Sequence, residues 1–154
     1  MAHGLRPARA EDRDFLLRVY GSTREEELRL VDWSVEQKAA FVQQQFEAQD
    51  AYYREHYFPA TFDVIEVDGT PAGRLYVARW EDEIRIIDIA ILPEHRGRGT
   101  GTALLRALLA EAAEAGKRLS IHVELNNPAR RLYERLGFAP VEERGVYVLM
   151  EATP

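Results

Sequence analysis

The chain contains no cysteine and only four histidines in its 154 residues. Without cysteine there is no disulfide framework and no thiolate zinc site, and the histidines lack the spacing of metal ligands. We therefore expect no metal. The sequence also has no apolar run of membrane-spanning length and no signal-peptide core at its N-terminus. We expect a cytoplasmic protein.

Positive charge is in the minority, with 20 Lys and Arg against 26 Asp and Glu, for a net charge of −6 at pH 7. Such a balance argues against general affinity for nucleic acid or for anionic membranes. The composition, 46% hydrophobic and 30% charged, is typical of a globular protein. The length suits one domain, so we predict a single domain over residues 1–154.

Hydrophobic patterning predicts an α/β (α+β) mixture. Strands are expected at residues 4–9, 61–67, 70–80, 83–92, 118–125 and 145–151. Helices are expected at residues 10–22, 34–57, 100–116 and 127–137. Ser34 is a predicted N-cap, Asp68-Gly69 a hairpin turn, and Gly116 a C-cap. The second half has the order of a strand–loop–helix–strand crossover.

Three glycines alternate between the predicted strand at 83–92 and the helix that follows it. Gly97, Gly99 and Gly101 stand beside Arg96 and Arg98. The first N–H groups of a helix have no partner within the helix, and its dipole adds partial positive charge there. Glycines let an anion approach this backbone closely. The segment therefore predicts an anion site, for which a diphosphate is the natural ligand.

Two common phosphate loops do not fit this segment. A Walker loop needs lysine and then Ser or Thr after its last glycine, but Gly101 is followed by Thr102 and Ala103. The dinucleotide fingerprint needs a glycine where Thr102 stands. The segment resembles instead the pyrophosphate loop of the GNAT superfamily of N-acetyltransferases, which reads Arg or Gln, two residues, Gly, one residue, Gly or Ala. Residues 96–101 match it fully.

A second stretch, "NNPARRLYERLGF" at residues 126–138, resembles the later signature of the same superfamily. Spacing from Tyr133 aligns the signature asparagine with Asn126, whereas spacing from the preceding strand aligns it with Asn127. The resemblance implies a twisted mixed sheet of about seven strands with helices on both faces. Two parallel strands, near residues 88–92 and 120–125, would splay apart and hold acetyl-CoA between them.

The resemblance also implies which residues contact the acetyl-CoA co-substrate. They are Ile91, Leu92, Arg96, Gly97, Arg98, Gly99, Thr100, Gly101, Thr102, Asn126 and Asn127. In the implied reaction the acetyl group passes directly to a primary amine, since the chain has no cysteine for an acyl-enzyme. The Ile91 amide would polarise the thioester carbonyl, and Tyr133 would stabilise or protonate the departing thiolate.

The residue that takes the proton of the amine is open. His122 lies on a strand before Asn126, where some relatives carry a glutamate, and Glu83 is a second candidate. A water chain could also serve. Asp88 stands in an apolar strand, so we expect it to be buried and paired with an arginine or a backbone N–H rather than to abstract protons.

Acceptor recognition is expected in the segment joining the first two helices, where Glu25, Glu26, Glu27 and Asp32 precede Trp33. These side chains could hold an ammonium, or they could be a solvated helix face. The downstream aromatic cluster of Tyr52, Tyr53, Tyr57 and Phe58 is expected to contribute as well, unless these rings only cover the sheet. We favour a small-molecule amine as acceptor. Alternatives are a protein N-terminus or lysine, a non-catalytic acyl-CoA-binding sensor, and a nucleotide-phosphate-binding protein unrelated to CoA. A homodimer is also left open.

Overall fold

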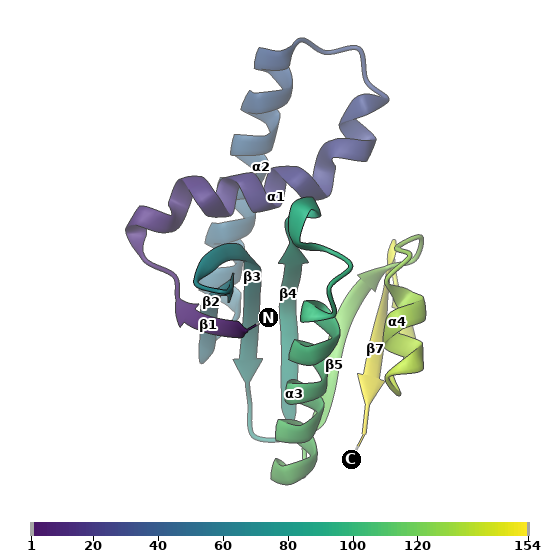
Figure 1. Cartoon of the computed structure of the whole chain (residues 1–154). Helices are drawn as coiled ribbons and strands as arrows, with labels where there is room; N and C mark the ends of the chain where they lie inside the picture. Colours follow the sequence, from purple (N-terminus) through teal and green to yellow (C-terminus); the bar gives the residue numbers. More distant parts are fainter. Residues whose placement is uncertain (1, 154) are drawn as a thin grey trace.

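The computed structural model describes residues 2–153 and contains a seven-stranded sheet in the order β1-β2-β3-β4-β5-β7-β6 (Figure 1). The strands are β1 (His3–Pro7), β2 (Ala60–Val67), β3 (Thr70–Arg79), β4 (Glu83–Ile91), β5 (Arg118–Glu124), β6 (Ala139–Arg144) and β7 (Tyr147–Ala152). The helices are α1 (Arg13–Arg29), α2 (Val35–His56), α3 (Thr100–Ala115) and α4 (Arg130–Arg135), with 3-10 turns at Ala10–Asp12 and Pro93–His95. No helix in this part of the chain is long and apolar enough to cross a bilayer.

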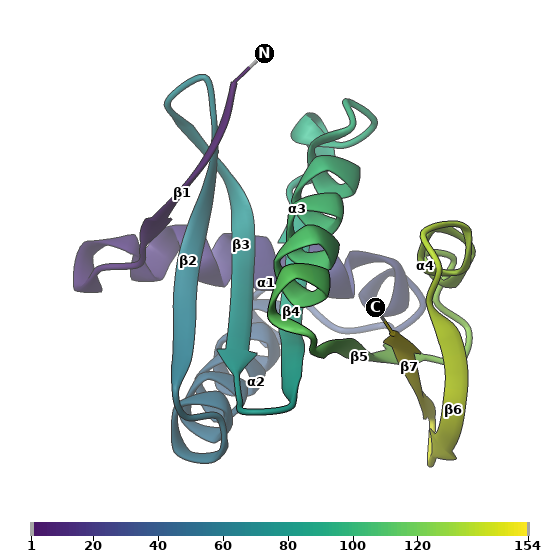
Figure 2. The same ribbon diagram turned by 90° about the horizontal axis from the view of Figure 1, so that it is seen from below.

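Helices cover both faces of the sheet, as expected (Figure 2). On one face, α3 and α4 pack on a core that includes Ile84, Ile86 and Ile121. On the other face, α1 and α2 form a smaller cluster around Phe46 and Val64. Alternation along each strand sends apolar side chains to the α3 face, so that neighbouring positions such as Arg85 face the other side.

The parallel pair β4–β5 is short. Its register joins Glu83–Ile86 to Arg118–Ile121 and ends there. Where this pairing ends, the β3–β4 pairing has a bulge between Tyr76 and Val77. Beyond the bulge, β4 and β5 diverge toward the top of Figure 1, below α1. The splayed parallel pair expected from the sequence is therefore present.

Local signals account for most element boundaries. The Ser34 side chain accepts from the Gln37 N–H, and the Gln37 side chain accepts from the Ser34 N–H, which makes a capping box for α2. Asp68 and Gly69 both have positive φ, as the tight β2–β3 turn requires. Gly116 ends α3 in the left-handed conformation, at φ 68°.

Three expectations were wrong in detail. The first helix continues to Arg29, because its polar C-terminal half remains helical on the protein surface. Strand β6 was missed because all six of its residues are exposed, so no apolar alternation marks it. Helix α4 begins at Arg130 rather than at Asn127, because Asn127 closes a separate turn before the helix.

Candidate active site

The glycine loop leads into the N-terminus of α3 in the way that an anion site requires. Gly97 and Gly99 adopt φ of 75° and 79°, and no side chain caps the helix. The first helical hydrogen bond runs from the Ala103 N–H to the Gly99 carbonyl, so the three preceding N–H groups have no partner within the helix. Thr100 is buried, and its hydroxyl has no partner among the described residues.

The end of β4 directs a backbone amide into the gap between the splayed strands. The Leu92 N–H donates to the Ala72 carbonyl of β3 at 2.8 Å. Because backbone groups alternate sides along a strand, those of Ile91 point away from β3, toward the β5 side. The Ile91 carbonyl accepts from Arg96 Nε at 2.7 Å, which ties the loop to the strand. The Ile91 N–H faces the gap.

A cleft of about 1040 Å³ opens where β4 and β5 separate. Its walls come from the C-terminal half of α1, the ends of β4 and β5, the turn before α4, and the β6–β7 turn. Several predicted site residues line it together: His122, Asn126, Asn127 and Tyr133.

Tyr133 lies at the wall of this cleft and is 6% exposed. Its ring also packs against Phe138, with centroids 5.7 Å apart. Burial, and secondarily the negative charge of Asp88, raises the pKa of its hydroxyl to about 12. The phenol therefore keeps its proton at neutral pH and is able to donate it.

His122 lines the cleft between two guanidinium groups. Arg85 Nη1 lies 3.3 Å from its Nδ1, and Arg144 Nη1 lies 3.1 Å from its Nε2. A neutral imidazole has one acceptor nitrogen, so at most one of these contacts is an N–H···N hydrogen bond. Burial and the two positive charges lower the pKa of His122. The ring is thus neutral at pH 7.

Glu83 stands at the opposite end of β4 from the gap and does not line the cleft. Its carboxylate accepts from Arg85 Nη2 and Arg118 Nη2, both at 2.9 Å, and from the Ser120 hydroxyl. These bonds tie together the paired ends of β4 and β5. Glu83 thus lies outside the cleft, although Arg85 contacts both its carboxylate and the ring of His122.

The two asparagines differ in what their side chains do. Asn127 Oδ1 accepts from the Ala129 N–H at 2.9 Å, an Asx turn that leads the chain into α4. No hydrogen bond of this kind engages the Asn126 side chain within residues 2–153, and Asn126 also lines the cleft. The geometry therefore favours Asn126 as the side chain available to a ligand.

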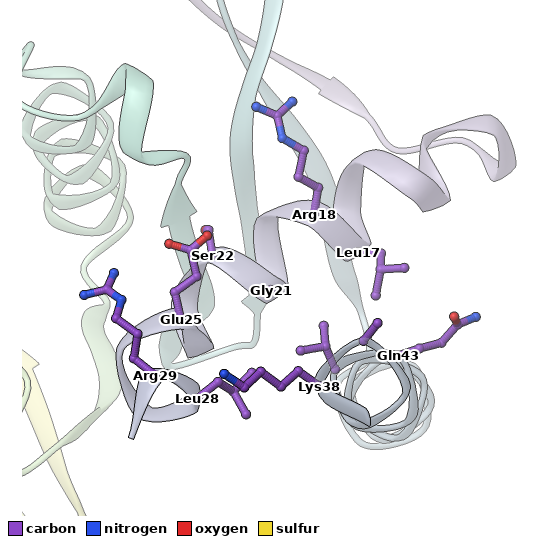
Figure 3. Close-up of a pocket in the computed structure, with 11 residues that line it drawn as sticks. Leu17, Arg18, Gly21, Ser22, Glu25, Leu28, Arg29, Lys38 and Gln43 are labelled. Carbon is purple, nitrogen blue, oxygen red and sulfur yellow. The ribbon is translucent and has the colours of Figure 1, made fainter. Parts of the chain in front are cut away.

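The three glutamates of the predicted acceptor segment lie within the last turns of α1 and are divided between two hollows. Glu26 and Glu27 line the cleft, whereas Glu25 lines a second hollow of about 530 Å³ between α1 and α2 (Figure 3). Trp33 packs edge to face on Phe41, with centroids 5.4 Å apart, and does not line the cleft. Only part of the predicted acceptor segment therefore faces the cleft.

On the acceptor side of the cleft, sequence reasoning missed Arg74 and Tyr20, whereas Tyr53 belongs to the aromatic cluster that was expected there. Arg74 Nη2 donates to Asp88 Oδ2 at 2.7 Å, and the Tyr53 hydroxyl donates to the same oxygen at 3.1 Å. The predicted pairing of Asp88 with an arginine is confirmed. Asp88 is paired with Tyr76 in the register and Arg74 with Ala90, so strand register, which the sequence does not show, brings Arg74 and Asp88 together.

A family model described as the acetyltransferase (GNAT) family matches residues 25–138, well over half of the chain. This protein is a member of the GNAT family. Members of the family use acetyl-CoA, and the matched range includes the glycine loop, the splayed strands and Tyr133. The resemblance drawn from the two sequence motifs is confirmed.

Individual relatives differ in their acceptors. The chain is 42% identical over 67 residues to the ribosomal protein bS18-alanine N-acetyltransferase of Haemophilus influenzae, covering 43% of this chain and 46% of the relative. It is 39% identical over 83 residues to the streptothricin acetyltransferase of Streptomyces lavendulae, covering 51% and 44%. The chain spans about half the length of such curated relatives.

Among solved structures, the fold is similar to that of the PaiA N-acetyltransferase from Thermoplasma acidophilum in complex with coenzyme A. The TM-score is 0.74 with 17% identity, over 100% of both chains. At this identity the likeness shows that the two chains share a fold.

Proposed function

We propose that this GNAT protein transfers the acetyl group of acetyl-CoA directly to the primary amine of a small molecule. The observation that carries the proposal is the splayed β4–β5 pair: the Tyr133 phenol lies on the cleft wall, the Ile91 amide faces the gap at the end of β4, and the glycine loop follows at the start of α3. This arrangement suits a thioester that enters from one face of the sheet and an amine that enters from the other.

The glycine loop and α3 would hold the diphosphate of acetyl-CoA. The unpaired N–H groups at the start of α3 and the Arg98 side chain supply donors and positive charge. The Thr100 hydroxyl, buried without a partner, fits a phosphate oxygen as its missing acceptor. The pantetheine amides would pair with the strand ends exposed in the gap, and Asn126 would contact the same arm.

The chemistry follows from three groups. The acceptor ammonium loses a proton to His122, and the neutral nitrogen attacks the thioester carbon. The Ile91 N–H hydrogen-bonds the oxyanion that forms. As the C–S bond breaks, the Tyr133 hydroxyl gives its proton to sulfur, and the second proton lost by nitrogen returns to Tyr133 through solvent. His122 then releases its proton to water, so that the products are an amide, CoA and one proton.

A protein N-terminus is the second candidate acceptor, because one relative is described as acting on an alanine of a ribosomal protein. The streptothricin relative supports a small molecule. We favour the small molecule because α1 and the β6–β7 turn wall the cleft on the acceptor side.

An amine panel tests the proposal. Purified protein is incubated with acetyl-CoA and with mono- and diamines, amino acids or alanine-starting peptides, and free thiol is measured. We expect acetylation of at least one small amine and slower reaction with the peptides. Tight acetyl-CoA binding without turnover on any amine would instead indicate a sensor. Displacement of CoA by ATP or NAD would indicate a nucleotide-binding protein.

A further inference from the structure

The Asp88 side chain occupies a particular position on the acceptor side of the cleft. Its carboxylate is 16% exposed, while the Arg74 side chain behind it is only 3% exposed. Arg74 lies against the rings of Tyr20 and Tyr76, with its guanidinium carbon 5.8 and 5.1 Å from the two centroids. Both side chains line the cleft, and the guanidinium is the more deeply buried partner of the two.

The hydrogen bonds on Asp88 leave it one open acceptor direction. Arg74 contributes two contacts, from Nη2 to Oδ2 at 2.7 Å and from Nε to Oδ1 at 3.3 Å, and Tyr53 contributes a third. A carboxylate has about four lone-pair sites. The three donors hold the group rigidly without saturating it. A further donor would have to come from the cleft.

Asp88 also lies close to the chemistry. Asp88 and Tyr133 both line the cleft, and the negative charge of Asp88 contributes to the raised pKa of Tyr133. The Ile91 amide is three residues farther along the same strand. A group bound to Asp88 from the cleft is thus close to the proposed thioester position.

The remaining charges of the cleft favour a cation. Its lining contains four carboxylates, Glu26, Glu27, Asp88 and Glu124, and two guanidinium groups, Arg24 and Arg74. Both guanidiniums are already paired, Arg24 with Glu27 at 2.6 Å and Arg74 with Asp88. Among the described residues, no basic side chain lies within ion-pair distance of Glu26 or Glu124, and both are exposed at the rim.

From this arrangement, and resting on the proposed acetyl transfer, we propose that Asp88 binds the ammonium group of the acceptor. We further infer that the acceptor carries a second cationic group, which the rim carboxylates Glu26 and Glu124 attract. Asp88 is thus a binding residue for the amine. The proposal assigns the substrate class: a small dicationic amine rather than an amino acid, whose carboxylate the rim would repel.

Wild-type protein gives the first test, with three acceptors of equal chain length: 1,4-diaminobutane, n-butylamine and 4-aminobutanoate. We expect kcat/KM to fall in that order, with the diamine at least tenfold above 4-aminobutanoate and the difference shrinking in high salt. Equal values for all three, or a preference for 4-aminobutanoate, would overturn the inference while leaving acetyl transfer established. Absence of turnover on any amine would overturn both proposals.

Asp88→Asn gives the second test. We expect KM for the diamine to rise about ten- to a hundredfold with KM for acetyl-CoA unchanged, because a charge-assisted hydrogen bond to the amine is lost. Asp82→Asn, an exposed site in the β3–β4 turn, removes the same charge away from the cleft and should change neither value. If Asp88 served only in a structural ion pair, Asp88→Asn would lower stability but would not raise KM for the diamine relative to KM for acetyl-CoA. That result would reject the role of Asp88 in binding the amine.

Glu124→Gln keeps the test decisive if Asp88→Asn does not fold, because Glu124 is exposed and supports no packing. We expect this variant to narrow the preference for the diamine over n-butylamine by several-fold. An unchanged preference would contradict the assignment of the second cation to the rim.

Discussion

The two sides of the cleft are built on different principles. On the cofactor side, the anion site is made of backbone: glycines at positive φ, unpaired N–H groups at the start of α3, and the free Ile91 amide. On the acceptor side, the wall is made of side chains from α1, α2, β3, β4 and the β6–β7 turn. The first set lies close together in the sequence, and the second is brought together only by folding.

This difference has a physical reason. A diphosphate and a pantetheine arm are the same in every reaction of the family, and backbone groups bind them with whatever side chains are present, provided that glycine permits the approach. An acceptor is recognised by charge and shape, which only side chains supply. Changes on the cofactor side should therefore affect acetyl-CoA binding and chemistry, whereas changes on the acceptor side should affect the amine.

Gly99→Val should have the largest effect. Gly99 has φ of 79°, where a β-branched residue is strained, and an added Cβ would meet no protein atom within 4 Å, so the side chain would take up open space beside the first N–H groups of α3. We expect acetyl-CoA affinity to fall about a thousandfold, roughly 4 kcal/mol, combining about 1–2 kcal/mol of strain with the loss of charge-assisted hydrogen bonds. Calorimetric titration measures it, with circular dichroism as the check on folding.

Gly101→Ala is the matched control for the loop. An added Cβ would meet only Ile91 Cδ1 at 3.5 Å, an ordinary contact, and the family pattern allows alanine there. We expect a change in acetyl-CoA affinity of less than tenfold. Equal affinity in wild type and Gly99→Val would refute the pyrophosphate-loop assignment.

Tyr133→Phe should have the next largest effect. It removes only the hydroxyl and keeps the contact with Phe138, so stability should change little. General acid catalysis contributes about two to four orders of magnitude, and thiolates are tolerable leaving groups, so we expect kcat to fall about a hundredfold. Acetyl-CoA affinity should stay the same. If Tyr133→Phe kept full turnover under conditions where chemistry limits the rate, Tyr133 would not be the general acid and its ring would serve only in packing.

The sequence predicted the cofactor side well, because that side is built from backbone groups that lie close together in the chain. It predicted the acceptor side poorly, because that side is built from side chains that only folding brings together. Gly99 and Gly116 were identifiable because positive φ demands glycine, and the splayed strands followed from the family motifs. Glu83 was a candidate base by its place in the chain, but it pairs with Arg118 across the closed end of the β4–β5 pair. No local pattern shows that Arg74 lies beneath Asp88, because strand register decides it.

His122→Gln should have a smaller effect, visible mainly in the pH profile. A base works in its deprotonated form, so its contribution is present above its pKa and lost below it. Burial, Arg85 and Arg144 lower the pKa of His122 from the ordinary 6.5, so the acid limb should lie below pH 6.5. We expect the acid limb to disappear from the pH profile of the variant. We also expect kcat/KM, calculated from the concentration of unprotonated amine, to fall about tenfold. An acid limb that persists unchanged in the variant would exclude His122 as the proton acceptor.

Ser34→Ala should have the smallest effect of these variants. It should lower thermal stability through α2 on the acceptor side and leave acetyl-CoA binding on the cofactor side unchanged. Ser34 caps α2, the helix that carries Tyr53 to the cleft, and it lies outside both hollows. Loss of an N-cap costs about 1 kcal/mol, which for a domain of this size lowers Tm by about 2–4 °C. Acetyl-CoA affinity should not change, since α3 and its loop pack on the opposite face of the sheet. Ser34→Asp retains a capping oxygen and should recover most of the lost Tm, with both variants compared by thermal unfolding and calorimetric titration. A loss of acetyl-CoA affinity in Ser34→Ala comparable to that in Gly99→Val would show that the two sides are coupled, against the division drawn from the cleft.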